Sequence, residues 1–114
     1  MKTKILCIDD DPMFGVLVNH LFKTIDTDIE VISKKSSSEG LTYLRSIGLY
    51  DLPHIILLDI NMNTHGGFQF LETYKNHGFN LSEVSIFMVS STVFPEDQRN
   101  ATSEPLIKGV FTKP

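Results

Sequence analysis

Short runs of apolar residues alternate along the chain with segments in which apolar residues recur every three or four positions. The runs are continuous, a pattern typical of strands that are covered on both faces of a sheet. They predict strands over residues 4–8, 29–32, 54–59, 84–89 and 107–112. The segments between them predict helices over residues 12–22, 36–48, 67–76 and 96–102.

Start signals support the first two helices. Asp11 stands before Pro12, the order expected of an N-cap residue followed by proline in the first turn. Ser36 and Glu39 have the spacing of a capping box, and the second helix is expected to end at Gly48. These capping signals therefore agree with the helices that the spacing of apolar residues predicts.

Strands that alternate with helices predict βαβ units, right-handed crossovers and a parallel sheet. Five short strands in 114 residues predict an α/β protein with one doubly wound, flavodoxin-like sheet of order 2-1-3-4-5. We expect a single domain over residues 1–114. In such a sheet the ligand lies beyond the carboxyl ends of the strands, here between the first and third strands.

Composition narrows the class of protein. The net charge is −4 and the pI is about 5.4, which disfavours nucleic acid as a partner. No apolar run is long enough for a membrane span and no signal peptide is recognisable. A single cysteine, Cys7, excludes an internal disulfide and most zinc sites, and its apolar surroundings indicate a small core residue. We expect a cytoplasmic protein.

Polar side chains with distinct chemistry follow four of the predicted strands. Asp9 and Asp10 follow the first strand, and Asp59 ends the third, its neighbour in the sheet. Carboxylates that converge repel one another and resist desolvation, so a cation is expected among them. Oxygen ligands of this kind suit Mg²⁺.

A hydroxyl and an amine complete the pattern. Ser90 and Ser91 stand at the end of the fourth strand, and Lys113 follows the fifth. Each alone would be an ordinary loop residue, but all of them fall on one edge of one sheet. Their convergence predicts a functional cluster.

Several motifs occur in order along the whole chain. They are I-D-D-D-P at 8–12, L-L-D-I-N-M at 57–62, a glycine at 67, M-V-S-S at 88–91 and the closing Lys113-Pro114. In these motifs and their spacing the chain resembles the receiver domain of two-component response regulators.

The resemblance implies a role for each residue at the strand ends. Asp59 is the implied phospho-acceptor. Asp10 and Asp59 are the implied direct ligands of Mg²⁺, together with the backbone carbonyl of Asn61, while Asp9 acts through water. Ser90 and Lys113 are the implied catalytic partners of the phosphoryl group.

Further roles concern lifetime and signalling. The side chains of Asn61 and Thr92 lie where family members tune the lifetime of the phosphorylated state. The implied phosphodonor is a histidine kinase or a histidine phosphotransfer protein, or a small phosphorylated molecule. The domain then catalyses its own phosphorylation and dephosphorylation and is a signalling domain rather than an enzyme. Movement of Ser90 would repack the face formed by the fourth helix and fifth strand, which binds a downstream output protein or domain.

The sequence departs from the family at four places. Asn63 replaces a frequent proline, Gly66-Gly67 replaces Asp-Gly, and Val110, followed by Phe111, stands at a position often held by an aromatic residue. We expect a mobile loop beside the site. The chain ends at Pro114 without the usual fifth helix, which predicts either a shortened chain or a partner that supplies the cover. Apolar residues of strands one and five and of helix one would then be uncovered, favouring self-association or lower stability.

Three alternatives remain open. One is a receiver that binds partners without being phosphorylated. Such a domain would not need an intact set of Asp9, Asp10, Asp59 and Lys113. A small flavin- or nucleotide-binding domain of the same topology needs a phosphate-binding loop after the first strand, where this chain has D-D-D-P. A metal-dependent phosphohydrolase would turn over phosphate esters. His65, near Asp59 in the sequence, is interpreted as a surface histidine.

Overall fold

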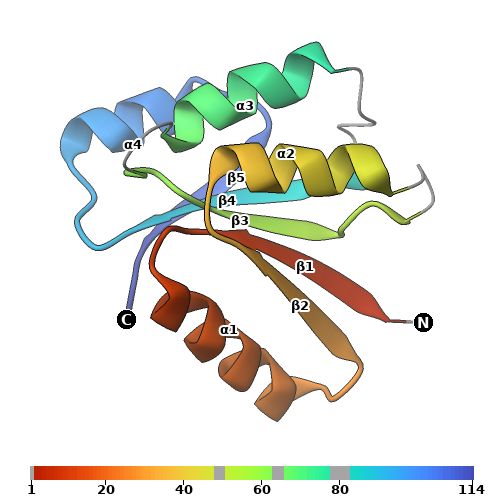
Figure 1. Ribbon diagram of the computed structural model, residues 1–114. Coiled ribbons are helices and arrows are strands. Elements are labelled where there is room, and N and C mark those ends of the chain that lie inside the picture. The colour runs from red at the N-terminus through yellow and green to blue at the C-terminus, as the bar shows by residue number, and fades with distance from the viewer. Residues whose placement is uncertain (1, 48–50, 63–65, 78–82) are drawn as a thin grey trace.

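The computed structural model describes residues 2–47, 51–62, 66–77 and 83–114. Within these residues five parallel strands form one sheet in the order β2-β1-β3-β4-β5 (Figure 1). The predicted class, strand order and helix positions are confirmed. The strands are β1 (Thr3–Ile8), β2 (Ile29–Lys34), β3 (Ile55–Asp59), β4 (Ser85–Ser90) and β5 (Ile107–Thr112). The helices are α1 (Pro12–Ile25), α2 (Ser37–Ser46), α3 (Gly67–Asn76) and α4 (Pro95–Thr102).

Two elements extend two or more residues beyond the prediction, while most other ends shift by one residue at most. Strand β2 continues to Lys34 because Ser33 and Lys34 pair with Cys7 and Ile8 of β1, although they are polar. Helix α1 continues to Ile25. The predicted end of α2 at Gly48 lies outside the described residues. No helix in the described part of the chain is long and apolar enough to cross a membrane.

The predicted helix starts are present. Asp11 caps α1, its Oδ1 accepting a hydrogen bond from the backbone N of Met13 at 3.0 Å. Ser36 caps α2, its Oγ accepting from the backbone N of Glu39 at 3.1 Å. The returning bond of the capping box is displaced by one residue, because Glu39 Oε2 accepts from the backbone N of Lys35 at 3.0 Å. These bonds satisfy amides that would otherwise lack a partner in the helix.

Helices α2, α3 and α4 lie on one face of the sheet and α1 lies on the other (Figure 1). On the first face, α2 and α3 bury Leu44, Phe70 and Tyr74 against sheet residues such as Ile56 and Leu58. All five side chains are at most 1% exposed. We call this face the covered face, and it holds the larger apolar core.

The other face, which we call the α1 face, has a smaller cluster. Cys7, Phe14, Val18 and Val89 are buried there. Burial, followed by repulsion from Asp9, raises the pKa of Cys7 to about 12, so the thiol stays protonated. The interpretation of Cys7 as a small core residue is confirmed.

Several large apolar side chains of the α1 face remain exposed. Met13 is 67% exposed, Leu21 is 45% exposed and Phe111 is 55% exposed. Uncovered residues on helix one and strand five were predicted, and they are found. The same prediction for strand one was wrong, because Ile5 and Cys7 of β1 are each 1% exposed. Self-association through these residues stays a prediction.

Candidate functional site

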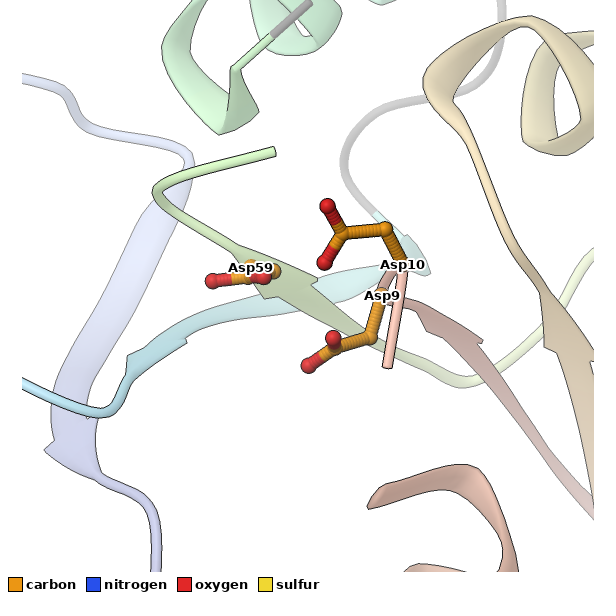
Figure 2. Close-up of side chains that lie close together, drawn as sticks. All are labelled: Asp9, Asp10 and Asp59. Carbon is orange, nitrogen blue, oxygen red and sulfur yellow. The ribbon is translucent and has the colours of Figure 1, made fainter. Parts of the chain in front are cut away.

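Three carboxylates meet at the carboxyl ends of β1 and β3. The two strands are paired up to Ile8 and Leu58, so the residues that follow emerge side by side. One carboxylate oxygen each from Asp9, Asp10 and Asp59 lies within 4.8 Å of the other two. Figure 2 shows the side chains of Asp9 and Asp10 extending toward the side on which Asp59 lies. The topology thus concentrates negative charge at the predicted switch point.

Local turns hold two of these carboxylates in place. Asp9 Oδ1 accepts a hydrogen bond from the backbone N of Asp11 at 2.9 Å, and Asp59 Oδ1 accepts from the backbone N of Asn61 at 3.2 Å. Each aspartate therefore bonds to the main chain two residues further on, as in an Asx turn. Both side chains are buried, with residue exposures of 4% and 3%. Their orientation is fixed without any ligand.

Lys113 supplies positive charge to the same edge. Its Nζ lies 2.6 Å from Asp9 Oδ2 and 3.6 Å from Asp59 Oδ2. The backbone N of Lys113 donates to the carbonyl of Ser90 at 2.8 Å, which anchors the end of β5 to the end of β4. The ammonium group also lies 4.8 Å from the centre of the Phe14 ring. Lys113 therefore bridges β1 and β3 and rests on α1.

Burial and the neighbouring charges both shift the pKa values of Asp59 and Lys113. Burial is the main cause that raises the pKa of Asp59, and repulsion from Asp9 adds to it, while Lys113 and the hydrogen bond from Asn61 oppose it. Burial lowers the pKa of Lys113, but the hydrogen bond to Asp9 and the charges of Asp59 and Asp9 outweigh it and raise the pKa overall. The acidic cluster lacks full compensation from Lys113 alone. A divalent cation would favour the ionised form of Asp59.

The hydroxyl predicted at the end of β4 is also in place. Ser90 is 2% exposed, and its Oγ accepts a hydrogen bond from Asn61 Nδ2 at 3.2 Å. Ser91 and Thr92 line the same hollow as Asp10, Asp59 and Lys113. The hollow has a volume of about 370 Å³, room for a phosphoryl group and an ion. All residues predicted for the site except Asp9 line this hollow, and Asp9 adjoins it through its contact with Lys113.

Glycine at position 67 has a steric reason. A Cβ atom there would lie 2.6 Å from the carbonyl oxygen of Asp59, and the backbone N of Gly67 donates to the carbonyl of Ile60 at 3.1 Å. The start of α3 therefore packs directly on the main chain of the predicted acceptor. The neighbouring Asn63 and His65, and the mobile loop predicted there, lie outside the described residues.

Sequence reasoning missed two aromatic residues at the site. Phe14 lies beneath the Lys113 ammonium, and Phe94 lines the hollow beside Asp59. Phe14 stands in the first turn of a helix that starts beside the acidic segment, a signal that could have found it. Phe94 directly precedes the helix start at Pro95 and gave no signal. Val110 and Phe111 point to opposite faces as predicted, since Val110 packs against the covered core and Phe111 against Phe87.

The fold and this site together define an α/β domain with acids, a hydroxyl and a lysine gathered at the carboxyl edge of a parallel sheet. The family described as the response regulator receiver domain matches residues 5–114. The chain belongs to this family. No curated protein matches it.

Solved structures agree with this assignment. A two-component response regulator from Cytophaga hutchinsonii has 26% sequence identity and a TM-score of 0.90, with 100% of this chain and 88% of that chain covered. A response regulator receiver protein from Dyadobacter fermentans has 29% identity and a TM-score of 0.85, with 98% and 87% covered. The chemotaxis protein CheY4 of Vibrio cholerae has 21% identity and a TM-score of 0.83, with 100% of this chain and 88% of that chain covered. It has the same fold.

Proposed function

We propose that the chain is a phosphoacceptor in which Asp59 receives a phosphoryl group from a phosphohistidine partner in a Mg²⁺-dependent reaction. The observation that carries the proposal is the meeting of three carboxylates within 4.8 Å, beside the ammonium group of Lys113. Bringing these carboxylates together costs desolvation and repulsion energy. Phosphoryl transfer accounts for this arrangement, because charged groups positioned in advance stabilise its transition state.

The residues present fit a magnesium ion. The ligands would be Asp10, Asp59 and the backbone carbonyl of Asn61, with Asp9 acting through water. These are hard oxygen donors, and carboxylates in small number are what Mg²⁺ usually takes from a protein. A bound Mg²⁺ would supply positive charge against the transferring phosphoryl oxygens.

The protein's own residues would then position and stabilise the transfer. Asp59, fixed through its Oδ1 by Asn61 N, presents its other oxygen, Oδ2, toward Lys113. That oxygen is the attacking atom. Lys113 would exchange part of its contact with Asp59 for a phosphoryl oxygen and offset the charge that develops there. Ser90 would donate its hydroxyl hydrogen to a second phosphoryl oxygen.

The same contacts provide a conformational signal. Ser90 Oγ now accepts from Asn61 Nδ2. A phosphoryl group on Asp59 adds charge and strong acceptors, so Ser90 would turn toward it and release Asn61. The loop between β4 and α4 would follow, and the surface of α4 and β5 would become the binding face of an output protein or domain.

Intact mass spectrometry tests the acceptor role. The protein is incubated with Mg²⁺ and acetyl phosphate or phosphoramidate, and we expect a gain of one phosphoryl group. Asp59→Asn should abolish the gain. Asp51→Asn is the matched control, because Asp51 lies near Lys4 at the start of β1, the far end from the site. An equal gain in Asp59→Asn would overturn the proposal, and no gain in the wild type would favour an unphosphorylated partner-binding domain.

Urea unfolding tests the metal site without any phosphodonor. At a Mg²⁺ concentration about ten times its Kd, binding to the folded state should add about 1.4 kcal/mol to the free energy of unfolding. Asp10→Asn should lose most of this gain, and Asp51→Asn should keep it. A full gain in Asp10→Asn would exclude Asp10 as a ligand.

A further inference from the structure

One side chain in the wall of the site has a different chemistry from its neighbours. The described residues that line the hollow are acids, an amide, hydroxyls and an ammonium group, with one exception, Phe94. The residue is 58% exposed. An exposed phenyl ring contributes little to the core, so its place beside Asp10 and Asp59 needs another explanation.

Hydrogen bonds of the main chain fix the backbone of Phe94. The backbone N of Phe94 donates to Asp97 Oδ2 at 2.9 Å, and its carbonyl accepts from the backbone N of Gln98 at 3.2 Å. Phe94 is thus the N-cap residue of α4, yet it caps through its backbone alone. Because the cap does not use the phenyl ring, substitutions of the side chain leave these bonds intact.

The direction of phosphoryl transfer brings the leaving group to the mouth of the hollow. The attacking and leaving atoms lie roughly in line across phosphorus. Asp59 is buried at the inner end, so the leaving group lies on the solvent side. A partly exposed ring in the wall of the hollow can contact it there.

We propose that Phe94 selects phosphodonors whose leaving group is an imidazole ring, by stacking on that ring. Aromatic pairs gain energy beyond simple burial, and a protonated ring gains a cation–π contribution as well. A non-aromatic leaving group has neither. The inference rests on the proposed function of Asp59 and adds donor specificity to it.

The transfer balances without a further reactant. Asp59 Oδ2 forms a bond to phosphorus while the bond between phosphorus and the imidazole nitrogen breaks. That nitrogen takes the electron pair of the broken bond. Because the other ring nitrogen of the donor already carries a proton, the leaving group departs as neutral imidazole.

Phosphorylation kinetics with two small donors test the proposal. Monophosphoimidazole carries the ring, and phosphoramidate carries only an amine. The measured quantity is the ratio of the two second-order rate constants, both in Mg²⁺. In Phe94→Ala we expect this ratio to fall about two- to tenfold, the range of an aromatic pair. Phe94→Leu should show a similar fall because it keeps bulk without a π face, and Phe94→Tyr should restore the ratio.

A matched control lies outside the site. Phe111 is 55% exposed and packs on Phe87, so Phe111→Ala should keep the wild-type ratio. An unchanged ratio in Phe94→Ala, or an equal loss with both donors, would overturn the role of Phe94 and leave that of Asp59 intact. Failure of the wild type to be phosphorylated by either donor would overturn both.

Discussion

On the covered face, α2, α3 and α4 enclose a continuous core in which large side chains such as Phe70 and Tyr74 are 0% exposed. On the α1 face, α1 is the one helix among the described residues, and it buries a small cluster and leaves Met13 and Leu21 in solvent. The two faces belong to the same strands and have similarly apolar residues. What differs is the number of helices that lie against them (Figure 1).

The functional site lies where the two faces meet. Asp59 ends the buried strand β3, while the ammonium group of Lys113 lies over the ring of Phe14 in α1. Apolar periodicity indicates which side of a helix is suited to burial. The element that packs against that side determines how much of it is buried. Stability should therefore be concentrated on the covered face.

The largest expected difference comes from one chemical change made on both faces. Leu58 is 0% exposed within the covered core, and Leu21 is 45% exposed on α1. Leu58→Ala should lower the free energy of unfolding by about 3 kcal/mol, because it opens a cavity in a closed core. Leu21→Ala should lower it by less than about 1 kcal/mol. Urea unfolding measures both, and equal losses would remove the distinction between the faces.

Two helix glycines sharpen the comparison. A Cβ at Gly40 would lie 2.6 Å from Ile8 Cδ1 and near the Phe70 ring, whereas a Cβ at Gly15 would lie 2.4 Å from Ser33 Oγ. Ile8 is enclosed and cannot move away, so Gly40→Ala should cost about 2 kcal/mol. Ser33 is exposed and can rotate its hydroxyl into solvent. Since alanine also favours a helix by about 1 kcal/mol, Gly15→Ala should stay within about 1 kcal/mol of the wild type.

Thermal unfolding of these two variants checks the prediction. A stability loss in Gly15→Ala as large as that in Gly40→Ala would show that the α1 face is packed as tightly as the covered face.

The smallest effect concerns an ion pair at the rim of the covered face. Lys75 Nζ lies 2.6 Å from Glu104 Oε2, and this hydrogen bond is the main cause that lowers the pKa of Glu104 below its usual 4.5. A lowered pKa in the folded state gives stability that is present above pH 4.5 and is lost as the pH falls through the folded-state value. The pair should contribute about 0.5 kcal/mol at neutral pH.

A double-mutant cycle of Lys75→Met and Glu104→Gln, measured by urea unfolding at pH 7 and at acidic pH, isolates this contribution. The coupling energy should decline toward acidic pH. A coupling energy that is the same at both pH values would contradict the assignment.

Much of the fold could be predicted because local and global signals agree. The continuous apolar run that ends at Asp59 is what a central parallel strand requires, and Asp11 before Pro12 starts a helix by local bonding alone. The length of β2 could not be predicted, since Ser33 and Lys34 are polar and extend the strand only by pairing with β1. Uncovered residues on helix one were predicted, but helical spacing could not show that Leu21 is among them, because burial depends on a second element.

The site could be predicted to the level of strand ends but not of atoms. Topology alone brings the end of β1 to the end of β3, so the convergence of Asp9, Asp10 and Asp59 follows from strand order. The preference of Lys113 for Asp9 over Asp59 depends on rotamers and on the support of the Phe14 ring. Phe94 could not be predicted because neither its exposure nor its place beside the hollow leaves a trace in the apolar pattern.

The most direct test of the account is to locate the phosphoryl group in the chain. After incubation with Mg²⁺ and acetyl phosphate, borohydride reduction converts an aspartyl phosphate to homoserine, which peptide mass spectrometry assigns to a position. The account predicts homoserine at position 59 and at no other aspartate. Homoserine at position 9, 10 or 11, or a phosphoryl group that borohydride does not convert, would contradict it.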